Sequence, residues 1–136
     1  MTKLLYEEIT GKIIAAAMEV HQTIGPGFLE AVYAEALAYE LKQLGLNFVS
    51  EQELKIKYKN IFLEKTYRAD YIVEDCILVE NKATNELTKI DEAQMFNYLK
   101  VTGKKVGLLF NYGKPSLEWK RVICEQYKIN KLVPSA

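Results

Sequence analysis

The spacing of apolar residues along the chain predicts three helices and five strands. Apolar residues recur every three or four positions, as in amphipathic helices, over 4–24, 28–44 and 89–102. Alternating or continuous apolar runs, which are typical of strands, cover 47–59, 61–74, 76–83, 106–110 and 117–124. The run 47–59 should present Leu54, Ile56 and Tyr58 on one face and its lysines on the other. The predicted order is therefore α-α-β-β-β-α-β-β.

This order predicts an α/β fold with a mixed β-sheet flanked by helices. The helix at 89–102 would be a crossover that makes strands 76–83 and 106–110 parallel. With 136 residues, the chain fits a single domain, residues 1–136. We expect its core to span about 5–124, followed by a polar C-terminal tail at 125–136.

Composition is that of a soluble globular protein, with 49% hydrophobic and 26% charged residues. There is no apolar stretch of the ~20 residues that a membrane span needs, and no signal-peptide pattern. Two cysteines make no disulfide framework, so we expect a cytoplasmic protein. The net charge is zero, but residues 100–136 hold eight basic and two acidic residues. This basic end is either a solvated surface or a source of phosphate contacts.

The candidate chemistry is concentrated in the predicted hairpin at 67–83. Asp70 and Glu80 each lie five residues from Asp75 at the turn, so they should be near-opposite neighbours with Cβ atoms about 5 Å apart. Lys82 shares a strand face with Glu80, and Asn81 points to the opposite face. Two carboxylates and an ammonium in an apolar hairpin are costly unless they are used. A divalent cation, Mg²⁺ or Mn²⁺, held by the carboxylates would be such a use.

Simpler structural interpretations stay open for each of these residues. Glu80 and Lys82 could form a same-face ion pair, and Glu30 could merely complement a helix dipole. Gln94 and Tyr98 are four residues apart on one helix face, where they could be ordinary surface and half-buried residues. His21, the only histidine, fits a packed ring or helix cap better than a catalyst.

Several stretches of the chain resemble the GxxExxY proteins, a family similar to the PD-(D/E)XK nuclease superfamily. The motif is formed by Gly27, Glu30 and Tyr33, and the similarity continues through HQTIGPGFLEAVY, YRADYIVED, VENKA, EAQMFNYLKVTG and VGLLFNYG. Together they cover roughly residues 5–124. One departure is Ala69, which stands where the superfamily's name places a proline, but the change removes no ligand.

The resemblance implies a restriction-endonuclease-like core and a role for each matching residue. Asp70, Glu80 and Glu30 match the metal-binding acids, and Lys82 matches the lysine that assists the attacking water. Gln94 and Tyr98 match an element that contacts substrate or positions the lysine. Asn81 is polar where such a strand usually has an apolar residue, so a buried Asn81 needs a partner.

Three functional interpretations follow from the sequence. The leading one is a Mg²⁺- or Mn²⁺-dependent nuclease that hydrolyses DNA phosphodiester bonds, with catalytic residues Lys82, Glu80, Asp70 and Glu30. The second is a catalytically weak module on a nuclease fold that binds nucleic acid or a partner protein, because the chain is small and has no recognition domain. The third is a structural protein whose carboxylates form ion pairs. A homodimer would suit two DNA strands, although nothing in the residues demands one.

Overall fold

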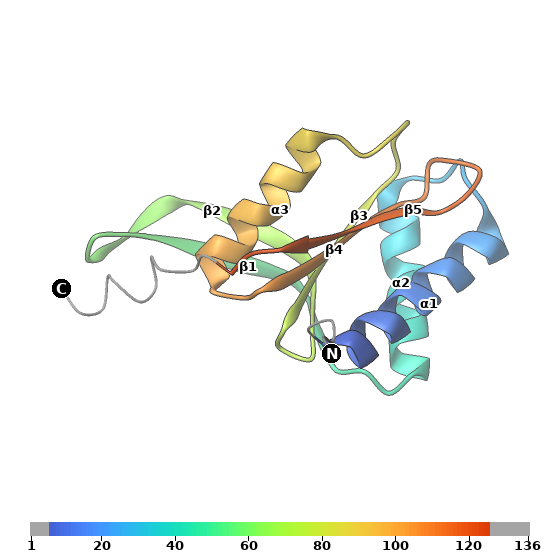
Figure 1. Cartoon of the computed structure of the whole chain (residues 1–136), viewed down its shortest axis with the longest axis horizontal. Helices are drawn as coiled ribbons and strands as arrows, with labels where there is room; N and C mark the ends of the chain where they lie inside the picture. The colour runs from blue at the N-terminus through green and yellow to red at the C-terminus, as the bar shows by residue number, and fades with distance from the viewer. Residues whose placement is uncertain (1–5, 126–136) are drawn as a thin grey trace, which may run out of the picture.

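The computed structural model describes residues 6–125, which fold into a five-stranded mixed sheet with helices on both faces (Figure 1). The elements are α1 (Glu7–Ile24), α2 (Glu30–Gln43), β1 (Phe48–Tyr58), β2 (Ile61–Val73), β3 (Ile77–Lys82), α3 (Lys89–Thr102), β4 (Val106–Asn111) and β5 (Glu118–Ile123). Their order confirms the predicted one. Within these residues, the helices are too short or too polar to cross a membrane. Apart from Glu125, the predicted tail lies outside the described residues.

The strands lie side by side in chain order, β1-β2-β3-β4-β5. β3 and β4 are parallel, in register from Ile77 opposite Val106 to Lys82 opposite Asn111, whereas the other neighbouring strands are antiparallel. This confirms the crossover through α3. A capping box fixes the start of α3, because the Thr88 and Asp91 side chains each accept a hydrogen bond from the other's backbone N–H.

Two separate cores cover the two faces of the sheet. On one face, α1 and α2 pack on β2, β3 and β4 through residues such as Ile13, Tyr33, Val79 and Phe110. On the other, α3 packs through Met95 and Leu99 on a second set of strand residues. The central strand β3 is therefore buried on both sides, which explains its continuous apolar sequence.

The β1–β2 ribbon changes face at Asp70. Tyr71 and Val73 belong to the core under α1 and α2, but Ala69 lies in the α3 core and Tyr67 packs against it. In a regular strand all four residues would share one face. The reversal lies beside Glu51 of β1, at φ 56°, between the register pairs Ser50–Tyr71 and Gln52–Ala69. Asp70 therefore sits at a local irregularity between the two cores.

The outer half of the same ribbon lies beyond both cores. Of the apolar face predicted for β1, Leu54 is buried, Ile56 is half-buried and Tyr58 is 55% exposed. In Figure 1, the β1–β2 turn lies at the end of the long axis opposite α1 and α2. None of α1, α2 and α3 covers this part, so the alternation in its sequence does not lead to burial.

Candidate active site

Two hydrogen bonds between β2 and β3 hold Asp70 beside Glu80, and each uses the carboxylate of one acid. The regular ladder between these strands ends at the pair Tyr71 and Val79. Beyond it, the Asp70 N–H donates to Oε2 of Glu80 at 2.8 Å, and the Asn81 N–H donates to Oδ2 of Asp70 at 2.8 Å. The carboxylates thus take the places of two backbone carbonyls, and the predicted neighbourhood of Asp70 and Glu80 is confirmed.

Burial makes both carboxyl groups weaker acids than usual. The pKa of Glu80 is raised to about 8, first because Glu80 is buried and then because the charge of Asp70 lies beside it. Burial also raises the pKa of Asp70, and the hydrogen bond from Asn81 opposes that shift. Lys82 favours the charged form of both acids, but its effect is smaller than that of burial. Burial therefore favours the protonated form of Glu80, and a cation could displace that proton.

Lys82 lies on the same side as Glu80 but is held by α3. Its Nζ donates to Oε1 of Gln94 at 3.2 Å and lies 3.9 Å from Oδ1 of Asp91. The backbone carbonyl of Lys82 accepts from the N–H of Tyr112, which fixes the strand end. The ion pair of Lys82 is thus with Asp91, and Gln94 orients its ammonium.

Tyr98 follows Gln94 by one helical turn and faces the same acids. It is 6% exposed, more buried than the half-buried side chain considered from the sequence, and its ring lies 4.9 Å from that of Tyr67. Burial raises its pKa to about 12, and the charges of Glu80 and Asp70 contribute. Tyr98 therefore stays a neutral phenol in the wall of the site.

Glu30 is the first residue of α2, and its charge raises the pKa of both Asp70 and Glu80. The loop before it is closed by Tyr33, whose hydroxyl donates to the Gly25 carbonyl at 2.6 Å and accepts from the Phe28 N–H at 3.2 Å. Gly27, at φ 111°, adopts a conformation that favours glycine. Gly27 and Tyr33 thus shape the loop that leads to Glu30 at the start of α2.

The donor set suits a hard divalent cation that keeps several water ligands. Each reciprocal contact uses one oxygen of its carboxylate, which leaves Oδ1 of Asp70 and Oε1 of Glu80 for another partner. The N–H and C=O of a strand residue point toward the same neighbouring strand, so the Asn81 carbonyl is also directed toward Asp70. Among residues 6–125, however, no three His, Cys, Asp or Glu side chains form a ready metal-binding group.

Comparison with protein families gives a match over residues 7–122 to the PD-(D/E)XK nuclease superfamily. The chain belongs to this superfamily. The crystal structure of SSO0001 has a similar fold, with a TM-score of 0.56 and 20% sequence identity. The similarity covers 77% of this chain and 55% of that chain. Comparison with curated proteins gives no match.

A cluster of aromatic side chains, which the sequence did not reveal, packs behind the end of β3 that carries Glu80 and Asn81. Asn81 is 1% exposed, and its Oδ1 accepts a hydrogen bond from the Tyr112 hydroxyl at 3.0 Å. The Tyr112 ring stacks on the Tyr33 ring with a centroid distance of 4.4 Å, and the His21 ring stacks on Tyr112 with a centroid distance of 6.3 Å. Asn81 thus has the required partner, although its Nδ2 has none. His21 is a packed ring, and its Nε2 lies 2.8 Å from the Lys114 carbonyl oxygen.

Two further acidic residues of this PD-(D/E)XK domain also escaped the sequence reasoning. Asp91 is part of a capping box, but it also reaches Lys82. Glu51 lies between the residues that pair with Tyr71 and Ala69, which brings it level with Asp70, and its charge raises the pKa of Asp70. Its backbone carbonyl accepts from Arg68. The spacing Thr88-Asp91-Gln94 was a usable signal for Asp91, whereas no local signal marked Glu51.

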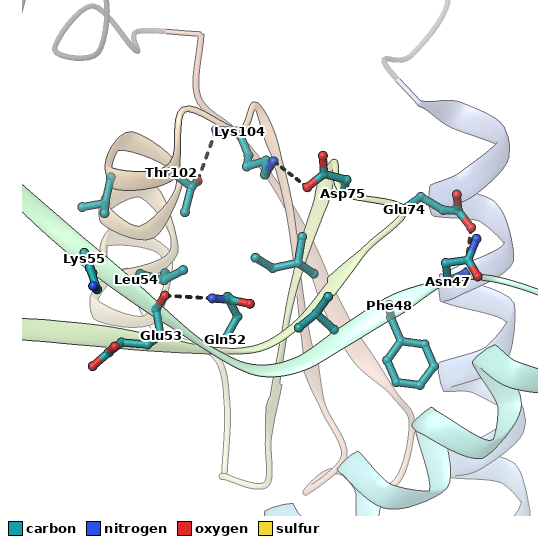
Figure 2. A pocket seen from close by; sticks show the side chains of 13 residues that line it. Asn47, Phe48, Gln52, Glu53, Leu54, Lys55, Glu74, Asp75, Thr102 and Lys104 are labelled. Carbon is teal, nitrogen blue, oxygen red and sulfur yellow. Dashed lines mark hydrogen bonds and ion pairs between the residues drawn. The ribbon is translucent and has the colours of Figure 1, made fainter. Parts of the chain in front are cut away.

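A pocket of about 650 Å³ lies apart from these residues, between β1 and the end of α3 (Figure 2). An ion pair of Lys104 with Asp75, at 3.1 Å, closes one side, and Phe48 and Leu54 contribute apolar walls. None of the predicted site residues lines it. The nuclease-type residues therefore occupy the opposite end of β3 from this pocket.

Three described lysines of the basic C-terminal part form ion pairs with acidic residues. Lys104 pairs with Asp75, Lys114 lies 3.9 Å from Glu118, and Lys120 lies 3.4 Å from Glu92. Lys128 and Lys131 lie outside the described residues. A role for this end in phosphate binding stays a prediction.

Proposed function

We propose that this protein is a nuclease of the GxxExxY type that hydrolyses DNA phosphodiester bonds with Mg²⁺ or Mn²⁺. The observation that carries the proposal is the acidic pair of Asp70 and Glu80 beside a lysine held by Gln94. A buried acid with a pKa near 8 is unfavourable for stability but is suited to bind a cation. Family membership supports this reading of the site.

In this proposal, Asp70, Glu80 and the Asn81 carbonyl would hold the cation, and Glu30 would add a negative charge at the edge of the site. A bound cation would lower the pKa of water and neutralise charge that develops on the phosphate. The Lys82 ammonium orients the attacking water and donates a hydrogen bond to it. Gln94 fixes the position of that ammonium, and Tyr98 offers a neutral hydroxyl to the substrate.

Cleavage of end-labelled single- and double-stranded DNA with Mn²⁺ tests this function. Wild type should cleave, whereas Lys82→Ala and Asp70→Asn should lose activity and keep their circular dichroism spectra. The matched control is Lys12→Ala, which changes an exposed lysine of α1 and should cleave as wild type does. Equal cleavage by wild type and Lys82→Ala would contradict the assignment of Lys82.

A second candidate function is binding of nucleic acid or a partner without cleavage. The observation that favours it is the lack of a ready three-ligand group among the described residues. It predicts salt-sensitive DNA binding that is indifferent to divalent cations. Stabilisation of the fold by Mn²⁺, measured as an increase in Tm, would argue for the nuclease instead.

A further inference from the structure

The distal part of the β1–β2 hairpin, residues 55–65, carries no core residue. We refer to these eleven residues as the arm. All of them are exposed except Ile56, which is half-buried, and none belongs to either hydrophobic core. A two-stranded ribbon gains little stability by itself. Its exposed apolar side chains, Tyr58, Ile61, Phe62 and Leu63, therefore do not serve the packing of this domain.

The arm is also a concentration of positive charge. It holds Lys55, Lys57, Lys59 and Lys65 against Glu64, a balance of +3, whereas the whole chain has a net charge of zero. The rest of the chain therefore carries −3. A polyanion would be attracted to the arm and repelled by much of the remaining surface.

Lysines and aromatic rings alternate in space on the arm. Lys57 lies opposite Phe62 in the strand register, and the Lys55 Nζ is 5.9 Å from the centroid of the Phe62 ring. At the turn, the Lys59 Nζ is 5.5 Å from the centroid of the Tyr58 ring. Phe62 is 62% exposed and Tyr58 55%. Exposed rings next to ammonium groups provide stacking for bases and contacts for the phosphates between them.

The arm is continuous with the candidate active site. β2 includes both Phe62 and Asp70, with a shift in its register against β1 between Lys55 and Lys57. Eight residues of strand span at most about 26 Å at ~3.3 Å per residue. β3 runs antiparallel to β2 and ends at Lys82, level with the residues just before Asp70. The β1–β2 ribbon therefore continues beyond Lys82, in the direction of the arm. A nucleic acid that crosses the site can therefore reach the arm.

We infer that the arm binds single-stranded DNA, with Phe62 and Tyr58 stacking on unpaired bases and its lysines contacting phosphates. This inference rests on the proposed function for its choice of ligand and adds the strandedness and the gripping surface. Stacking requires bases that are out of a duplex, which is why a single strand fits these rings. A second copy of the chain fits less well, since two arms of +3 would repel and edge lysines oppose strand pairing.

The test measures binding of fluorescein-labelled oligo(dT) and of a matched duplex by anisotropy, across a salt series in chelator to prevent cleavage. The variant Tyr58→Leu/Phe62→Leu keeps the apolar character and removes the rings. The variant Lys55→Gln/Lys57→Gln/Lys59→Gln removes three charges. Matched controls are Tyr39→Leu, an exposed ring of α2, and Lys12→Gln/Lys42→Gln, exposed lysines of α1 and α2.

Loss of the rings should weaken oligo(dT) binding by about 5-fold to about 150-fold for each stacked base, with the salt dependence unchanged. Loss of the three lysines should reduce the slope of log K against log[salt] by about 2. The controls should bind as wild type does. Equal affinity of wild type and the ring variant for oligo(dT) would overturn the inference, as would no oligo(dT) binding by wild type. Dissociation of a wild-type dimer on loss of the rings, seen by sedimentation, would also overturn it.

The two proposals fail in different ways. Arm-dependent binding of oligo(dT) without any cleavage in Mn²⁺ would remove the nuclease and keep the arm. Cleavage by wild type together with unchanged binding and cleavage by both arm variants would remove the arm and keep the nuclease.

Discussion

Oε2 of Glu80 lies 2.8 Å from the backbone nitrogen of Asp70, so the second acid of the pair is held by the main chain of the first. The Asp70 carboxylate in turn accepts from Asn81, the residue after Glu80. Substituting either acid therefore changes two things, a charge and a contact between β2 and β3. Useful variants are those that keep the hydrogen bond and remove only the charge.

Glu80→Gln should stabilise the metal-free protein at alkaline pH. In the fold, Glu80 keeps its proton up to about pH 8, whereas its ordinary pKa is 4.5. Between these values the folded state binds more protons than the unfolded state, so the free energy of unfolding falls as pH rises, by at most about 1.4 kcal/mol per pH unit. The amide keeps an acceptor for the Asp70 N–H but cannot ionise.

Thermal unfolding in chelator from pH 5 to 9 measures this difference. The Tm gap between Glu80→Gln and wild type should widen with pH, and Glu86→Gln, an exposed loop residue, should follow wild type throughout. Parallel Tm curves for wild type and Glu80→Gln would show that Glu80 does not titrate as its burial indicates.

Affinity for Mg²⁺ or Mn²⁺ should increase with pH if the cation binds between Asp70 and Glu80. A cation that displaces the Glu80 proton gains up to about tenfold in affinity per pH unit below the pKa near 8. Calorimetric titrations between pH 6 and 8 in buffers of different ionisation enthalpy measure both affinity and proton release. An affinity that does not vary with pH would place the cation elsewhere.

Gln94→Leu should reduce cleavage by about 10- to 100-fold, in the range usual for residues that orient a catalytic group. The substitution leaves Lys82 in place and removes the oxygen that holds its Nζ at 3.2 Å. Single-turnover rates with saturating Mn²⁺ are the measurement. Lys89→Leu, an exposed change at the start of the same helix, serves as a control. Wild-type rates for Gln94→Leu would mean that Asp91 alone holds the lysine.

Tyr33→Phe should destabilise the fold by about 1–3 kcal/mol, because it leaves the Gly25 carbonyl and the Phe28 N–H without their shared partner. The ring still stacks on Tyr112, so the core is retained. Urea unfolding compares it with Tyr39→Phe, whose ring is 61% exposed and which should have no effect. If the Tyr33 and Tyr39 variants unfold alike, the hydroxyl does not close the loop.

The sequence by itself determined the order of the elements and most of the candidate site. Period-2 and period-3.6 patterns depend on local geometry, so helices and strands were readable, and α3 was placed to within a residue. The turn at Asp75 fixed the register of a tight hairpin, which brought Asp70 opposite Glu80. The spacing on α3 likewise placed Gln94 one turn before Tyr98.

Only the tertiary structure decided what long-range packing controls. The change of face at Asp70 places Ala69 in the core under α3 and Tyr71 in the core under α1 and α2. Tyr112 lies 31 positions after Asn81 in the sequence, and the parallel pairing of β3 and β4 brings the two side chains together. Burial of Glu80 on a central strand gives it a pKa near 8. These features depend on which elements pack against each other over long sequence separations, and the spacing of residue types within one element does not specify that packing.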